Sequence, residues 1–352
     1  MAASDVLKRR YDFVLLFDVL DGNPNGDPDN GNIPRMDEQT LQGIVTDGCL
    51  KRKIRNAVAA IQQDGDGKVL PGYDLYFQTQ DAVYERRVLN LLHQSAWDAL
   101  GIKPATDEAP ASDAAAQEEP VGGKKAKKAK AKGDDRGDFD NVRKAREWMC
   151  ANFYDIRAFG AVMTTGVNCG QVRGPVQMTY SRSVDPIVPM DISITRKSVT
   201  TVKEAREQIN KVDEDTKTRF GTITGTMGRK NTVPYGLYRC HGFVNPYLAR
   251  DTKFTEADLE LLWAALKDQM WAIDRSASRG LMATKGLVAF EHTSPLGNAP
   301  AHELFARLHV PPLGADKAPR GYDDYDAELD LTAVPEGVKV HILVDPRKAG
   351  RR

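Results

Sequence analysis

The sequence predicts an α+β fold whose element order is compatible with a βαββαβ, RRM-like (ferredoxin-like) unit. Three observations carry this prediction. Runs of β-branched and apolar residues, bounded by turn residues, indicate strands at Tyr11–Leu20, Tyr235–Val244 and Val338–Val344. Apolar residues that recur every three or four positions indicate helices at about 47–61 and 256–273. Long polar segments separate these elements and are predicted to be insertions.

Composition limits the class of protein. The chain has 352 residues, which suffices for one elaborated domain or two small ones, and 41% of them are hydrophobic. No apolar stretch approaches transmembrane length, and Asp18 makes the first apolar run too short for a signal peptide. Lysine plus arginine and aspartate plus glutamate are equal at 49 each, so net charge does not indicate a polyanionic partner. Four isolated cysteines are typical of a reducing cytoplasm.

The first strand, Tyr11–Leu20, is expected to be central and buried, and the Asx-, Gly- and Pro-rich loop Asp21–Asn32 ends it. The loop opens like a calcium-binding loop, but Asn32 stands where a bidentate glutamate is needed, so no metal site is predicted. An aspartate after a strand could also assist phosphodiester cleavage, and no partner for it is visible in the sequence. The candidates are Asp21, Asp27 and Asp29.

A helix follows from an N-cap at Thr46-Asp47 to about Ile61. Its apolar stripe is predicted to comprise Leu50, Ile54, Val58 and Ile61, with Ala57 beside it. Its basic residues are Lys51, Arg52, Lys53 and Arg55, and no acidic residue is interleaved among them. The helix is therefore predicted to present a positive ridge, which is either an ordinary solvated face or a contact for phosphates.

The segment between this helix and residue 140 mixes short elements with a biased insertion. A short strand at Leu75–Phe77 and a helix around Val88–Trp97 are predicted. Residues 104–135 lack apolar periodicity and contain a lysine-rich tract, which predicts disorder or a mobile insertion. Another helix is expected from about Asp138–Asp140.

Glycines are dense in Thr164–Gly174, just before a strand at Pro175–Tyr180. They indicate either tight turns or a close approach of the backbone to a ligand, with Arg173 at the end of the loop. Ser183–Gly236 is long and polar, which predicts a protruding hairpin or arm. Its notable side chains are Arg196, Lys197, Met227, Arg229 and Lys230. An exposed methionine beside basic residues suits wedging between bases, and it would suit a protein contact equally well.

The C-terminal half supplies the remaining elements. Thr255–Asp258 resembles a capping box and opens a helix whose stripe runs from Leu259 to Ile273. Ser276–Glu291 is expected to form two short strand-like pieces around Lys285-Gly286, and Val338–Val344 a last strand.

Several long segments, in this order, resemble the backbone subunit of the type I-C CRISPR Cascade complex, a member of the repeat-associated mysterious protein (RAMP) superfamily. They are FDVLDGNPNGDPD, GIVTDGCLKRKIRNAV, RAFGAVMTTGVNCGQVRGPVQ, GTMGRKNTVPYGLYRCHGFV, DRSASRGLMATKGLVAF and SPLGNAPAHELF. The resemblance covers most of the chain but not residues 104–135 or the part after Arg320.

This resemblance implies a single RRM-like domain shaped like a hand. The palm would comprise about 8–62, 140–186 and 235–345, the finger insertion about 63–139, and the thumb about 187–234. Residues 104–135 would be the disordered, lysine-rich part of the finger. Copies of the family stack head to tail along one CRISPR RNA, and each thumb flips out a nucleotide.

The implied partners are CRISPR RNA, further copies of the chain, the 5′-end-capping, large and small Cascade subunits, and target DNA through the guide. Implied RNA contacts are Lys51, Arg52, Arg55, Arg173, Arg196, Lys197, Arg229 and Lys230, with Met227 as the wedge of the thumb. No cofactor, no membrane and no catalytic residue are expected, and the expected location is the cytoplasm of a prokaryote. Related type III subunits cleave RNA with an aspartate after the first strand, so a ribonuclease using Asp21, Asp27 or Asp29 is the rival hypothesis, and a scaffold without nucleic acid is a third.

Overall fold

The computed structural model describes residues 5–78, 88–102, 135–196, 198, 200–203, 226–314 and 317–347. The predicted disorder of 104–135 falls outside this part of the chain, except for Asp135, which begins a helix. Lys197 also lies outside it.

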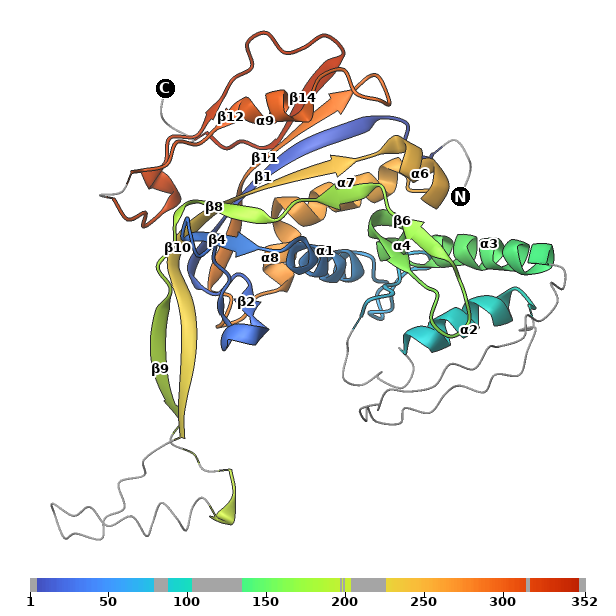
Figure 1. The fold of residues 1–352 in the computed structure, drawn as a ribbon, viewed down its shortest axis with the longest axis horizontal. Coiled ribbons are helices and arrows are strands. Elements are labelled where there is room, and N and C mark those ends of the chain that lie inside the picture. Colours follow the sequence, from blue (N-terminus) through green and yellow to red (C-terminus); the bar gives the residue numbers. More distant parts are fainter. Residues whose placement is uncertain are drawn as a thin grey trace, which may run out of the picture.

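A mainly antiparallel sheet forms the centre of the fold, with the strand order β14-β11-β1-β10-β8-β4 (Figure 1). β1 lies in the interior of the sheet, as predicted, and pairs with β10 on one side and β11 on the other. The short strands β7 and β9 also pair with β10. The bounds are β1 Arg10–Gly22, β4 Gln42–Val45, β7 Val176–Met178, β8 Ser181–Pro186, β9 Met190–Arg196, β10 Thr226–Val244, β11 Leu281–His292 and β14 Val338–Val344.

Two strand predictions need correction. β11 is one continuous strand rather than two pieces, because Leu16 pairs with Gly286 and Phe17 with Thr284, which leaves Lys285 as a bulge within the ladder. Leu75–Phe77 does not form a strand, and only Asp74 makes an isolated bridge, to Phe153. The backbone amides of Tyr76 and Phe77 donate to the carboxylate of Asp155 instead of to a neighbouring strand.

Helices cover one face of the sheet. α1 (Asp47–Ile61) begins at the predicted N-cap Thr46, and α7 (Glu256–Ala264) begins with the predicted capping box. A π-helical turn (Ala265–Gln269) joins α7 to α8 (Met270–Ile273). Their buried stripes pack on the side chains of β1 that point to this face, which are Phe13, Leu15, Phe17 and Val19. The predicted stripes are too long at one end, because Ile61 and Ile273 are exposed at the helix termini.

The opposite face of the sheet is covered by the C-terminal segment. Val14 and Leu16 of β1 pack against Leu304, Phe305 and Tyr325. This cover contains α9 (Ala301–Ala306), β12 (Leu308–His309), a 3-10 turn (Tyr322–Asp324) and β13 (Glu328–Leu329). Both faces of the sheet are therefore buried.

A third cluster builds a lobe beside the helical face (Figure 1). It packs α2 (Leu89–Ala99) and α3 (Asp135–Asn152) on α4 (Tyr154–Phe159), β5 (Gly160–Val162) and β6 (Gln171–Arg173). α3 begins earlier than predicted. The remaining elements are β2 (Gly26–Asp27), a 3-10 turn (Pro28–Asn30), β3 (Ile33–Pro34) and α6 (Pro246–Thr252). Among the described residues no helix has the length and apolar character needed to cross a membrane.

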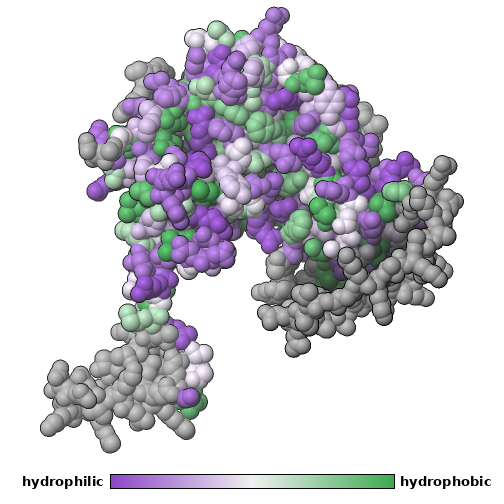
Figure 2. Space-filling model, viewed as in Figure 1, coloured by the Kyte–Doolittle hydropathy of each residue, from purple (hydrophilic) through white to green (hydrophobic). Residues whose placement is uncertain are grey.

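A two-stranded arm extends away from the sheet (Figure 1). β10 continues beyond the sheet as residues 226–232 and pairs there with β9, from Thr226 opposite Arg196 to Thr232 opposite Met190. The predicted protruding hairpin is therefore present in the structure. Figure 2 shows open space beside the arm, below the body of the molecule.

Candidate nucleic-acid interface

The basic residues of α1 are paired with other groups, which corrects the prediction of an unpaired positive ridge. Lys51 bonds Asp47 one turn earlier at 2.9 Å. Lys53 is buried and pairs with Asp274 after α8. Because these partners neutralise most of the charge, the helix alone is a weak electrostatic site for phosphates.

Arg55 points into the protein rather than to solvent. Its Nε donates to the Asp155 carboxylate at 2.9 Å, and both side chains are buried. The guanidinium also lies over the rings of Phe77 and Phe159, 5.2 and 5.1 Å from their centroids. Asp155 further accepts the backbone N–H of Tyr76 at 2.8 Å and that of Phe77 at 3.0 Å. Arg55 thus joins α1 to the lobe, and its buried guanidinium is not placed to contact RNA.

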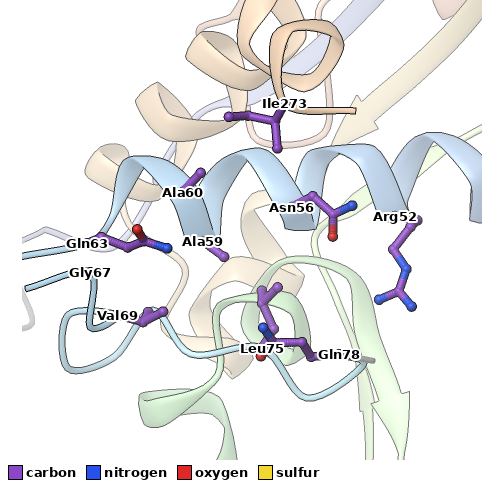
Figure 3. Close-up of a pocket in the computed structure, with 10 residues that line it drawn as sticks. All are labelled: Arg52, Asn56, Ala59, Ala60, Gln63, Gly67, Val69, Leu75, Gln78 and Ile273. Carbon is purple, nitrogen blue, oxygen red and sulfur yellow. The ribbon is translucent and has the colours of Figure 1, made fainter. Parts of the chain in front are cut away.

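Arg52 lies on the accessible side of α1. Its guanidinium donates to the backbone carbonyl of Phe77 at 2.6 Å. It borders a pocket of about 530 Å³ between α1 and the chain that follows it (Figure 3). The lining residues are Arg52, Asn56, Ala59, Ala60, Gln63, Gly67, Val69, Leu75, Gln78 and Ile273. Sequence reasoning missed the three amides, although Asn56 lies one turn after Arg52 on the same face of α1.

The register of the arm separates its predicted site residues onto two faces. Met227 and Arg229 alternate with Gly228, so they share one face, and Lys230 lies on the other. The Met227 side chain is 73% exposed. Arg229 pairs with Asp191 across the strands at 3.1 Å, with both side chains exposed. Lys230 turns back and donates to the carbonyl of Ala277 at the base of the arm.

The face that carries Lys230 also holds apolar side chains. Met190, Ile192 and Ile194 alternate along β9 and are exposed by 41, 42 and 51%. Gly228 lies opposite Ile194, and Lys230 lies opposite Ile192. The arm therefore has one face with a methionine and an arginine and another with an apolar row, and both open to solvent.

The glycine-rich loop is explained by the chain's own packing. A Cβ on Gly160 would lie 2.4 Å from the Val172 carbonyl oxygen, and one on Gly174 would lie 2.3 Å from that of Ala158. Side chains at these positions would prevent β5 and β6 from approaching each other. Arg173 is exposed beside this hairpin and borders a separate pocket with Arg10 and Leu296. The structure thus does not bring Arg173 together with Arg52.

The loop after β1 shows no assembled catalytic group among the described residues. Asp27 pairs with Arg35 at 3.3 Å and accepts the backbone N–H of Asp29, which is the ordinary role of an aspartate in a turn. Asp21 adopts a positive φ of 51° at the end of β1. Within the described ranges, no three His, Cys, Asp or Glu side chains are arranged to hold a metal ion. Burial raises the pKa of the nearby Cys49 thiol, which keeps it protonated and a poor nucleophile.

Two further basic side chains come from the loop between α8 and β11. Arg279 donates to the carbonyls of Asn23 and Pro24, and so ties this loop to the one after β1. Arg275 is exposed and has no hydrogen bond or ion pair within the described part of the chain. Because Lys230 bonds Ala277 in the same loop, Arg275 lies near the base of the arm. It lies in DRSASRG, a segment without periodicity that could have indicated a site.

The fold and these surfaces define a mixed α/β protein built on a mainly antiparallel sheet, with both faces of the sheet covered and a hairpin arm extending from it. The family model described as "CRISPR-associated protein Cas7" matches residues 9–330. The chain belongs to this Cas7 family.

Individual relatives share between 12% and 27% of the aligned residues with this chain. The chain is 27% identical over 281 residues to "CRISPR-associated protein Cas7" of Haloferax volcanii. This alignment covers 74% of this chain and 65% of the length of that protein. Among solved structures, it is similar to a chain of a "CRISPR RNA-guided surveillance complex, pre-nicking", with a TM-score of 0.44, 12% identity and coverage of 80% of this chain and 78% of that one. A chain of another "CRISPR RNA-guided surveillance complex" gives a TM-score of 0.39 at 12% identity, over 80% of this chain and 68% of that one.

Proposed function

We propose that this chain is a non-catalytic backbone subunit that binds CRISPR RNA, polymerises head to tail along it in a type I-C Cascade, and presents it for pairing with target DNA. Its partners would be further copies of itself and the end-capping, large and small subunits of that complex. Membership of the Cas7 family supports this proposal. The location would be the cytoplasm.

The strand order supports an RRM-like palm. When the four strands β1, β8, β10 and β11 are numbered one to four in chain order, their order in the sheet is 4-1-3-2. α1 follows the first of them and α7 the third, as in a βαββαβ unit. We assign residues 187–234 to the thumb and 63–139 to the finger. In an RNA recognition motif, bases stack on the open sheet face, but here the C-terminal segment covers that face. RNA would therefore bind along the helical side and the arm.

The observation that carries the proposal is the arm with its exposed Met227. Separating two stacked bases costs a few kcal/mol, so an apolar side chain must fill the gap. Met227 stands clear of the body, and Arg229 lies on the same face two residues later to hold a displaced phosphate. An arm with a neighbouring copy as its partner would act at a regular interval along the RNA.

The remaining contacts would be made with the RNA backbone, which carries no sequence information and so suits any guide. We assign them to Lys51, Arg52, Arg173, Arg196 and Lys230, and add Arg275. Lys197 stays in this set as a prediction from sequence. Arg55 is removed from it, because its guanidinium is buried against Asp155.

The experiment compares wild type with Met227→Ala on a CRISPR RNA. The absorbance ratio of the purified protein shows whether nucleic acid co-purifies, and nuclease digestion of the complex shows where the RNA is protected. We expect periodic protection for wild type and loss of the period for Met227→Ala. Leu331→Ala is the control, since Leu331 is also an exposed apolar residue (43%) but lies outside the arm and away from the assigned RNA contacts.

The outcomes separate the hypotheses. A wild-type protein that carries no RNA and binds none would contradict the proposal and favour a scaffold without nucleic acid. Equal, periodic protection in Met227→Ala would show that the kinking element lies elsewhere in the chain.

A further inference from the structure

The pocket beside α1 has an unusual set of polar side chains. Its lining contains the guanidinium of Arg52 and the carboxamides of Asn56, Gln63 and Gln78, and no carboxylate among the described residues. Its volume of about 530 Å³ lies within the range of about 300–1,000 Å³ typical of sites that enclose a small molecule. Ala59 and Gly67 add little bulk to its walls, so a flat group can lie close to the backbone.

The carboxamides that line the pocket lack hydrogen-bond partners within the described part of the chain. Within the described part of the chain, the side chains of Asn56 and Gln63 make no hydrogen bond, and the buried Oε1 of Gln78 has no partner. The partly exposed amides of Asn56 and Gln63 are therefore open to hydrogen bonds from a ligand in the pocket, and the unsatisfied Gln78 oxygen could join them after rotation of its amide. Figure 3 shows Asn56 and Arg52 directed from α1 toward the segment that carries Gln78.

We propose that this pocket receives one base of the bound RNA after that base has left the stack. The inference rests on the proposed function and adds a place for the displaced base. A carboxamide offers both a carbonyl acceptor and N–H donors, so the amides can pair with the edge of any of the four bases. Arg52 supplies the positive charge that the adjoining phosphate requires.

A nucleic acid suits this lining better than an acidic or basic peptide does. The charged group of the described lining is a cation, and the other polar groups are neutral amides that match heterocyclic edges. The pocket also solves an energetic problem of the arm, since a base that Met227 unstacks loses its neighbours. Hydrogen bonds in the pocket would offset part of that cost without selecting a sequence.

The test uses a series of short RNAs, each with a single abasic nucleotide at a different position. The affinity of the wild-type protein is measured for each RNA. We expect one position at which loss of the base weakens binding about tenfold, the size of one stacked or hydrogen-bonded base. The variant Asn56→Ala/Gln63→Ala/Gln78→Ala should bind the intact RNA less tightly and lose the response at that position. Gln62→Ala is the control, because Gln62 adjoins Gln63 but does not line the pocket.

Exchanging the four bases at the responsive position should change wild-type affinity by less than about threefold, since the amides adapt to each. The inference is overturned if no position responds, if the triple variant responds like wild type, or if one base is preferred more than about tenfold. A protein that binds no RNA at all contradicts the proposed function instead. Circular dichroism of the triple variant shows whether it is folded. If it is unfolded, the series of abasic RNAs with the wild-type protein alone tests whether one base is bound in the pocket.

Discussion

The guanidinium of Arg157 grips the carboxylate of Asp258 with two hydrogen bonds, Nε to Oδ2 at 2.9 Å and Nη2 to Oδ1 at 2.8 Å, across 101 residues of sequence. Both side chains are completely buried. Asp258 also accepts the backbone N–H of Thr255 in the capping box of α7, and Arg157 donates to the carbonyls of Cys150 and Gly72. One ion pair therefore joins α3, α4 and α7.

Replacing Asp258 with Asn should lower the free energy of unfolding by about 3–5 kcal/mol, because it leaves the Arg157 charge buried and uncompensated. Urea unfolding measures this directly. Asp251→Asn is the control, since Asp251 pairs with Arg146 at the surface and its loss should cost less than about 1 kcal/mol. Equal midpoints for both variants would contradict a structural role for the buried pair.

Arg55→Ala should also destabilise the protein, by about 3 kcal/mol, because Asp155 would remain buried with only backbone donors. The comparison is Arg143→Ala, whose guanidinium is exposed and 3.6 Å from Asp140. The free energy of unfolding of that variant should lie within about 0.5 kcal/mol of the wild-type value. If Arg55→Ala keeps wild-type stability and loses RNA affinity, the inward role assigned to Arg55 is incorrect.

Lys51→Ala and Arg52→Ala should weaken RNA binding without unfolding the protein, since both side chains reach solvent. The slope of the logarithm of affinity against the logarithm of salt should flatten by up to ~0.7 for each phosphate that the variant no longer neutralises. Lys68→Ala, an exposed lysine beyond the end of α1, is the control. An unchanged slope in the double variant would exclude this helix from the interface.

The stability of the protein should fall as the pH is lowered from about 6.5 to about 4, in part through His241. Burial, followed by the neighbouring Arg239, lowers the pKa of His241 to about 4. The unfolded chain therefore takes up a proton that the folded chain refuses, so unfolding is favoured below the ordinary histidine pKa of about 6.5.

His241→Phe keeps an aromatic ring to stack on Phe305, whose ring centroid lies 4.5 Å away, and removes the ring nitrogens that take up the proton. Between pH 6.5 and 5 the variant should lose about 1 kcal/mol less unfolding free energy than wild type, a value reduced for partial solvent screening. His302→Phe, on an exposed position of α9, should keep the wild-type slope. Parallel curves for His241→Phe and wild type would show that His241 titrates alike in both states.

The protein should not cleave RNA. Guide-bound protein incubated with complementary RNA and magnesium or manganese is expected to leave that RNA whole, because Asp27 is engaged by Arg35 and by the turn. Gel analysis of end-labelled RNA is the measurement. Regularly spaced cuts that disappear in Asp21→Ala, Asp27→Ala or Asp29→Ala would establish the ribonuclease hypothesis.

Features that depend on neighbours in the chain could be predicted from sequence. Thr46 and the box at Thr255–Asp258 cap their helices because the bonds span only three residues. Runs of apolar and β-branched residues predict the strands at Tyr11–Leu20 and Val338–Val344. The arm is predicted because the segment that forms it lacks such a run. The bulge at Lys285 lies where the pattern breaks, although the strand itself continues.

Only the tertiary structure decided what the charged and polar side chains contact. The partners of Arg55 and Lys53 lie 100 and 221 residues away, so a helix whose sequence predicts an exposed basic ridge has two of its cations buried in ion pairs. The cover over the second sheet face and the amide pocket beside α1 likewise join distant segments. Periodicity records which side of an element is apolar, whereas a charge is exposed or neutralised according to which distant group the fold places within a few ångströms of it.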